Sequence, residues 1–221
     1  AAYPDVLIEY VQSMLHPEYP SKRNDVAIIL PVYNEEERIA SVIDFIKSLQ
    51  VLINESFINA NIYFVNDGSK DNTKDMIEKI SKDEYEQSTL VSNKYPIYSY
   101  NLNINTRKAG TYLEGIRNID ASILIFADAD NSFSIEDIAK IINILNVGYY
   151  DIVAGTKDET AENRPLIRRI MSFSKRLLTK GMLPKGVYDS QTGLKGMSWY
   201  AAKTILPYLH EDTGLAIDLE I

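Results

Sequence analysis

Short apolar runs alternate with helix-like patterns along most of this chain. The runs that predict buried strands are residues 26–32, 61–65, 97–102, 122–127 and 151–155. Between them, apolar residues recur every three or four positions, as they do over 39–49, and this is the spacing of one face of a helix. The alternation predicts an α/β fold: a mainly parallel central sheet with helices on both faces.

Polar motifs follow three of the predicted strands. "YNEEE" comes after the first strand, "NDGS" after the second and "DADNS" after the fourth. In open parallel sheets, ligands bind beyond the carboxyl ends of the strands. The sequence therefore predicts one binding site at that edge, assembled from these three turns.

Asp128 and Asp130 are the most suggestive residues in these turns. They stand two apart at the end of an apolar strand, so their carboxylates are expected to point the same way. Such a pair suits Mg²⁺, which binds one or two protein carboxylates together with substrate phosphates. Taken alone, the pair fits equally well with a strand that runs out into a polar loop.

The other two turns also have two interpretations. In "DGSKDNT", Asp67 can accept hydrogen bonds from a nucleoside, or the segment is a loop that caps the next helix. In "PVYNEEERI", Tyr33 offers an aromatic face and Glu35 an acceptor, and Asn34 is expected to cap the helix that follows.

Composition and charge argue against several classes of function. The net charge of −8 argues against a nucleic-acid partner, and there is no cysteine for a thiolate metal site. No G-x-G-x-x-G follows the first strand, which disfavours a dinucleotide-dependent oxidoreductase. No run of about 18 apolar residues is present to span a membrane. The chain stops inside an apolar pattern, so we expect a fragment whose missing part could hold a membrane anchor.

The motifs in combination are more specific than any one of them. "LPVYNEEERI", "VNDGSKDNT", "NTRKAGTYLEGI", "FADADNSFSIED" and "DSQTGLKGM" occur in this order. Over roughly residues 20–221 the chain resembles the family 2 glycosyltransferases with the GT-A fold. Within them it looks most like the polyprenyl-phosphate sugar synthases, and especially the dolichyl-phosphate glucosyltransferase branch.

The resemblance implies a single GT-A catalytic domain over residues 1–221. Residues 1–24 would form an N-terminal extension, and 156–221 an acceptor-side region truncated at its end. The donor nucleotide would be held by Pro31, Tyr33, Glu35, Asp67, Lys108 and Asp128.

The remaining implied roles concern the metal, the reaction and the acceptor. Asp128 and Asp130 would bind the metal, Mg²⁺ or Mn²⁺. Asp130, Asp189 and Arg168 would be catalytic, and Arg164, Arg168 and Arg169 would hold the acceptor phosphate. A solvated basic face at a membrane surface also fits these arginines.

The sequence departs from the family's pattern at three positions. Asn66 stands where the first of two aspartates is usual, and Arg107 and Ala109 replace two glycines.

The expected reaction is metal-dependent, inverting transfer of a hexose from a nucleotide-sugar donor, UDP-glucose favoured, to a polyprenyl or dolichyl phosphate. This would take place at the cytosolic membrane face. The alternatives are a GDP-mannose donor, a polysaccharide or soluble acceptor, and a sugar-nucleotide-binding module without catalysis.

Overall fold

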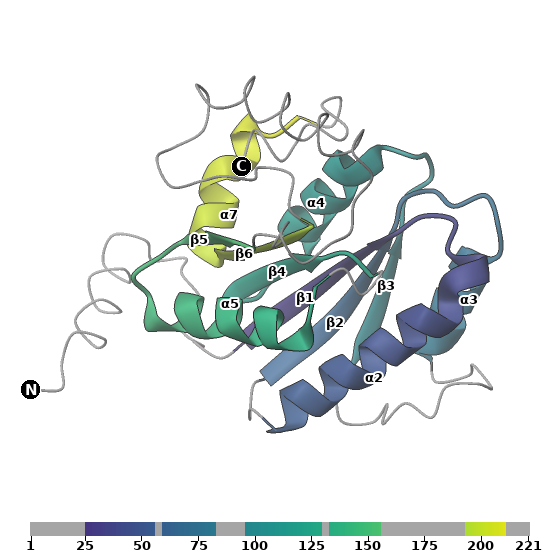
Figure 1. Ribbon diagram of the computed structural model, residues 1–221. Helices are drawn as coiled ribbons and strands as arrows, with labels where there is room; N and C mark the ends of the chain where they lie inside the picture. The colour runs from purple at the N-terminus through teal and green to yellow at the C-terminus, as the bar shows by residue number, and fades with distance from the viewer. Residues whose placement is uncertain (1–24, 56–58, 83–95, 130–132, 156–192, 211–221) are drawn as a thin grey trace, which may run out of the picture.

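The fold was analysed in a computed structural model that describes residues 25–55, 59–82, 96–129, 133–155 and 193–210. Its strands are β1 (Asp25–Val32), β2 (Asn59–Asn66), β3 (Ile97–Asn101), β4 (Ile123–Ala127), β5 (Ile152–Ala154) and β6 (Leu194–Ser198). They form one six-stranded sheet in the order β3-β2-β1-β4-β6-β5 (Figure 1). The five predicted strands are therefore confirmed, and the segment "LKGMS" forms the sixth.

Four of the strands run in parallel and bring their carboxyl ends to one edge of the sheet. β1 pairs in parallel with β2 and β4, and β2 pairs in parallel with β3. β6 runs antiparallel to both of its neighbours, β4 and β5. Its first residue therefore lies where β4 and β5 end. We call this edge, beyond Val32, Asn66, Asn101 and Ala127, the site edge.

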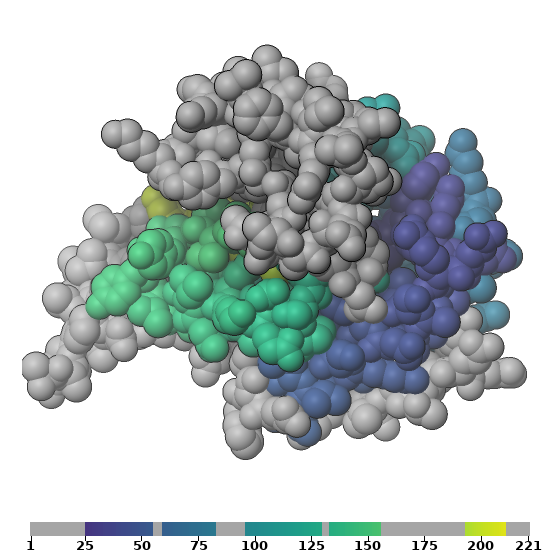
Figure 2. All heavy atoms as spheres, in the orientation of Figure 1, coloured from purple at the N-terminus to yellow at the C-terminus, as the bar shows by residue number. Residues whose placement is uncertain are grey.

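Helices cover both faces of the sheet, as predicted. They are η1 (Glu36–Arg38), α2 (Ile39–Glu55), α3 (Thr73–Ser81), α4 (Arg107–Asn118), α5 (Ile135–Val147), α7 (Trp199–Ile205) and η2 (Leu206–Tyr208). Helices α2, α3 and α5 pack on one face, and α4 and α7 on the other. Figure 1 shows α2 and α5 in front of the sheet, and Figure 2 shows them side by side on the near surface.

The two cores follow from the alternation of side chains along β1. Ile28 and Leu30 point into the core beneath α2 and α5, whereas Ala27 and Ile29 point into the core beneath α4. All four side chains are fully buried. A strand covered on both faces needs apolar residues at every position, and this is why "VAIILPV" has no polar alternation.

Helix α5 has defined signals at both ends. The Ser134 hydroxyl accepts a hydrogen bond from Asp137 N (3.2 Å) and so caps the start of the helix. Gly148 ends the helix in the left-handed conformation, with φ 78°. The helix lies close to β6 because Gly196 has no side chain. A Cβ there would meet Leu145 Cδ1 at 2.7 Å and Ile125 Cδ1 at 2.8 Å.

Within the described part of the chain, no helix combines the length and the apolar character needed to cross a membrane.

Candidate functional site

A cleft of about 350 Å³ opens at the site edge. Five of the residues predicted to hold a donor nucleotide line it together: Pro31, Tyr33, Glu35, Asp67 and Lys108. They come from three segments far apart in the sequence, namely the end of β1 with its loop, the turn after β2, and the start of α4. Two of the three predicted turns, those after β1 and β2, thus meet at this cleft, and the start of α4 completes it.

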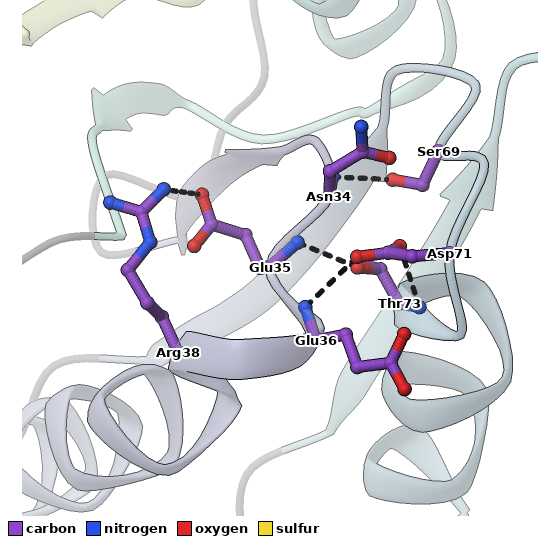
Figure 3. A network of polar contacts seen from close by, with 7 residues as sticks. All are labelled: Asn34, Glu35, Glu36, Arg38, Ser69, Asp71 and Thr73. Atoms are coloured by element: carbon purple, nitrogen blue, oxygen red, sulfur yellow. Dashed lines mark hydrogen bonds and ion pairs between the residues drawn. The ribbon is translucent and has the colours of Figure 1, made fainter.

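The loop after β1 is fixed to the loop after β2 by hydrogen bonds (Figure 3). Asn34 N donates to Ser69 Oγ (3.0 Å), and Lys70 N donates to Asn34 Oδ1 (2.8 Å). Asn34 has φ 53°, a left-handed conformation that asparagine tolerates. The expectation that Asn34 caps the next helix is wrong, because its side chain bonds across to the neighbouring loop instead.

A second set of bonds positions Glu35. Its backbone N–H donates to Thr73 Oγ1 (2.7 Å), and Glu36 N donates to Asp71 Oδ2 (3.2 Å). The Glu35 carboxylate pairs with Arg38 at 2.8 Å. Figure 3 shows these contacts converging between the two loops. The wall of the cleft formed by residues 33–35 is therefore held in place by the turn that carries Asp67.

Asp67 connects the cleft to the start of α4. Its Oδ1 accepts hydrogen bonds from Thr106 N (2.7 Å) and from Thr106 Oγ1 (3.0 Å). Asn105 Nδ2 donates to the Asp67 carbonyl oxygen (3.2 Å). Burial raises the pKa of Asp67 above its ordinary value, and hydrogen bonds from Thr106 and the Arg107 backbone oppose that rise. Asp67 is thus both a wall of the cleft and an anchor for the loop that carries Lys108.

The structure gives a reason for asparagine at position 66. Asn66 is 1% exposed, and its Nδ2 donates to Asn101 Oδ1 (2.9 Å). Its Oδ1 accepts from Ser69 N (3.1 Å). An ionised aspartate could accept from Ser69 but could not donate to Asn101. The amide therefore joins β2, β3 and the turn at Asp67 through one buried side chain.

Four cleft residues were not predicted: Val32, Asn105, Arg107 and Thr111. Arg107 has φ 60°, so the backbone keeps a glycine-like conformation at the position where the family pattern has glycine. Ala109 is buried in ordinary helix. In the sequence, Arg107 is noticeable because it replaces a glycine of the family's pattern. That replacement alone does not show that Arg107 lines the cleft. Lys108, beside it, places its Nζ 5.4 Å from the centre of the Tyr112 ring.

Asp128 lies at the site edge, directly after β4, and does not line the cleft described above. Its backbone N–H donates to the Gly193 carbonyl oxygen (3.2 Å). The Asp128 carboxylate occupies the space that a side chain at position 193 would fill, since a Cβ there would overlap Oδ2 and lie 3.0 Å from Oδ1. Gly193 thus makes room for Asp128, a role that sequence reasoning missed because the two residues are distant in the chain.

Of the two predicted metal ligands, the described residues include Asp128. Asp128 supplies a carboxylate, the donor type that Mg²⁺ and Mn²⁺ prefer. Within the described ranges, no three or more His, Cys, Asp or Glu side chains gather closely enough to hold a metal. The second predicted ligand, Asp130, lies outside these ranges.

The remaining predicted residues also lie outside the described residues. They are Asp189, assigned beside the reacting sugar, and the acceptor-side residues Arg164, Arg168 and Arg169. Their roles stay predictions.

Comparison with known proteins identifies relatives across most of the chain. The profile described as "Glycosyl transferase family 2" matches residues 27–206. A dolichyl-phosphate beta-glucosyltransferase of Dictyostelium discoideum is 26% identical over 219 residues, which is 95% of this chain. The chain spans 64% of that relative's length.

Solved structures share the fold at low sequence identity. Glucosyl-3-phosphoglycerate synthase of Mycobacterium tuberculosis, in complex with UDP, has a TM-score of 0.55 at 16% identity, covering 100% of this chain and 73% of that one. The mannosyltransferase PcManGT of Pyrobaculum calidifontis, in complex with GDP-Man and Mn²⁺, has a TM-score of 0.56 at 15% identity, covering 91% and 53%. The GT-A fold predicted from the sequence is thereby confirmed.

Proposed function

Because the chain belongs to glycosyl transferase family 2, we propose that it is an inverting glycosyltransferase. It transfers a hexose from a nucleotide-sugar, UDP-glucose, to a polyprenyl or dolichyl phosphate. One observation carries this proposal: Tyr33, Asp67 and Lys108 converge in one cleft at the site edge, where Asp128 also lies. The name of the Dictyostelium relative supports the choice of sugar and acceptor.

The cleft offers the groups that a nucleoside diphosphate requires. Tyr33 is 39% exposed and presents an aromatic ring beside Pro31, against which a base can stack. The Asp67 carboxylate accepts hydrogen bonds from the base or the ribose. Lys108, at the start of α4, also lines the cleft and supplies positive charge for the diphosphate. Together these side chains account for recognition of the nucleotide.

The reaction is one displacement at C1 of the sugar. An oxygen of the acceptor phosphate forms the new bond to C1, and the bond from C1 to the donor diphosphate breaks. The electron pair of that bond leaves with the nucleoside diphosphate, and the configuration at C1 inverts. The acceptor phosphate is already an anion near neutral pH, so the step requires positioning and charge stabilisation more than a general base.

The other predicted site residues would act on the metal, the acceptor phosphate and the reacting sugar. Asp128 and Asp130 would hold Mg²⁺ or Mn²⁺, which when bound neutralises charge on the leaving diphosphate. Arg164, Arg168 and Arg169 would hold the acceptor phosphate, because arginine binds phosphate bidentately. Asp189 would lie beside the reacting sugar. We place the reaction at the cytosolic face of a membrane, where a lipid phosphate is available.

The donor is tested by a thermal-shift screen of the 221-residue chain with UDP, GDP, UDP-glucose and GDP-mannose, each with Mg²⁺ or Mn²⁺. We expect UDP species to stabilise the wild type, and the double variant D128A/D130A to lose most of that stabilisation. Equal stabilisation of variant and wild type would overturn the metal site. Preference for GDP-mannose would favour mannosyl transfer, a donor found with the same fold in the Pyrobaculum enzyme.

The acceptor is tested by transfer from the preferred donor to a polyprenyl phosphate, compared with soluble sugars. We expect a glycosylated lipid phosphate as the product. Transfer to soluble sugars alone would overturn the proposed acceptor. Nucleotide binding without any turnover would identify a binding module instead.

A further inference from the structure

Arg107 has an unfavourable backbone conformation for its residue type. Among the described residues, only Asn34 and Arg107 combine a side chain with a positive φ, 53° and 60°. Asparagine adopts this conformation readily, whereas for an arginine it is unfavourable. Glycine would have no such cost. A residue held in an unfavourable conformation beside a binding cleft is a reason to ask what its side chain does.

The backbone conformation at position 107 does not explain why the residue there is an arginine. The loop is held by Asp67, which accepts hydrogen bonds from Thr106 N and Thr106 Oγ1 and from the backbone of Arg107. These bonds use the main chain and the Thr106 hydroxyl. A glycine at position 107 would keep all of them without the conformational cost. The group that an arginine adds at this position, compared with glycine, is the side chain with its guanidinium.

Arg107 lines the cleft next to Lys108. The cleft also contains two acids: Glu35 pairs with Arg38, and Asp67 accepts the bonds at the start of α4. Arg107 and Lys108 are two consecutive cations among the lining residues, in a chain whose net charge is −8. Such a pair matches an anionic ligand.

We propose that Arg107 binds the diphosphate of the nucleotide-sugar through its guanidinium. This inference rests on the proposed function. The planar fork of arginine can donate two parallel hydrogen bonds to phosphate oxygens, a geometry that lysine lacks. Arg107 and Lys108 together supply two positive charges. The chain therefore binds a nucleoside diphosphate even without a divalent cation, and Arg107 provides much of that binding.

The test compares Arg107→Gly with wild type by calorimetric titration of UDP and of uridine, in Mg²⁺ and in EDTA. In EDTA we expect UDP affinity to fall about tenfold or more, the effect of losing a charge-assisted hydrogen bond. Uridine has no phosphate, so its affinity should change less than about twofold, within RT. The Tm of the variant should be no lower than that of wild type, because glycine relieves the backbone strain.

Two further variants make the result specific. Arg117→Ala removes the same charge from the other end of α4 and should bind UDP as wild type does. Arg107→Lys keeps the charge without the fork, and its UDP affinity should fall between those of wild type and Arg107→Gly.

The outcomes separate this inference from the proposed function. If wild type binds UDP or GDP and Arg107→Gly binds it equally well, Arg107 has no such role, and the proposed function stands. A parallel loss of uridine and UDP binding would show a structural role for Arg107 and would also overturn the inference. If wild type binds neither nucleotide, both the proposed function and the inference fall.

Discussion

Gly193 determines where the Asp128 carboxylate can lie. Any side chain at position 193 would occupy the space that this carboxylate fills. Gly193→Ala should therefore displace Asp128 and weaken metal-dependent nucleotide binding about tenfold or more, the effect of losing one charged contact. Isothermal titration of UDP with and without Mn²⁺ measures this effect.

Gly155→Ala is a matched control for that variant. A Cβ at Gly155 would lie 3.3 Å from Leu194 Cδ2 and 3.4 Å from Phe133 Cε1, which small shifts can relieve. Its Mn²⁺-dependent binding should match wild type. Unchanged binding in Gly193→Ala would show that the position of Asp128 does not matter for the metal.

Asp67 combines a cost in stability with a role in binding. Burial raises the pKa of Asp67, so the folded chain holds this proton more tightly than the unfolded chain. Stability from this group therefore falls as the pH rises from the ordinary carboxyl range through the raised pKa, and it is constant above it. Asp67→Asn does not titrate and keeps an oxygen that can accept from Thr106.

We expect the free energy of unfolding of Asp67→Asn, relative to wild type, to increase over that pH window. Its affinity for UDP at pH 7 should fall, because the carboxylate that we propose to accept from the nucleoside is gone. Urea unfolding between pH 4 and 7, together with nucleotide titration, measures both. A stability difference that does not change with pH would contradict the raised pKa.

At the scale of elements, Ser134 fixes the start of α5. Its hydroxyl accepts from Asp137 N, so Ser134→Ala should lower the free energy of unfolding by about 1 kcal/mol. Ser48 lies inside α2, where its hydroxyl donates to the Asp44 carbonyl oxygen on an exposed face. Ser48→Ala should change stability by less than about 0.5 kcal/mol. Equal effects in chemical denaturation would contradict the cap.

The elements and the mainly parallel sheet covered on both faces could be predicted from the pattern of the sequence, whereas the order of the strands and the direction of β6 could not. Strand β1 is fully apolar because helices cover both of its faces, and the cap at Ser134 is visible as a serine three residues before an acid. By contrast, the antiparallel direction of β6 depends on its pairing with β4 and β5, which are distant in sequence. Local pattern does not contain that information.

The same distinction applies to the site. Tyr33, Glu35 and Asp67 could be assigned to one site because parallel strands bring their carboxyl ends together, and Lys108 was added only through the resemblance to the family. The contact between Gly193 and Asp128 depends on how the chain returns to the sheet. The cross-loop bonds of Asn34 depend on side-chain orientation, and local sequence pointed instead to a helix cap.

At the scale of the whole molecule, the two cores on either side of the sheet support a cleft built from loops on one edge. A ligand that binds only the folded chain stabilises it by about 2.7 kcal/mol at a hundredfold excess over Kd. For a chain of this size, 1 kcal/mol raises Tm by about 2–4 °C. The thermal-shift screen should therefore give shifts of about 5–10 °C at such concentrations, well within the range that dye-based melting resolves.

The direction of β6 has a consequence for how proteins of this fold diversify. Because β5 and β6 are antiparallel, the chain leaves the sheet at Gly155 and returns at Gly193 with the two points adjacent: Gly155 N donates to the Leu194 carbonyl oxygen (2.9 Å). Closing a loop between neighbouring points costs only about 0.6 kcal/mol more for each doubling of its length. The number of residues that join Gly155 to Gly193 can therefore change at little cost in loop-closure free energy.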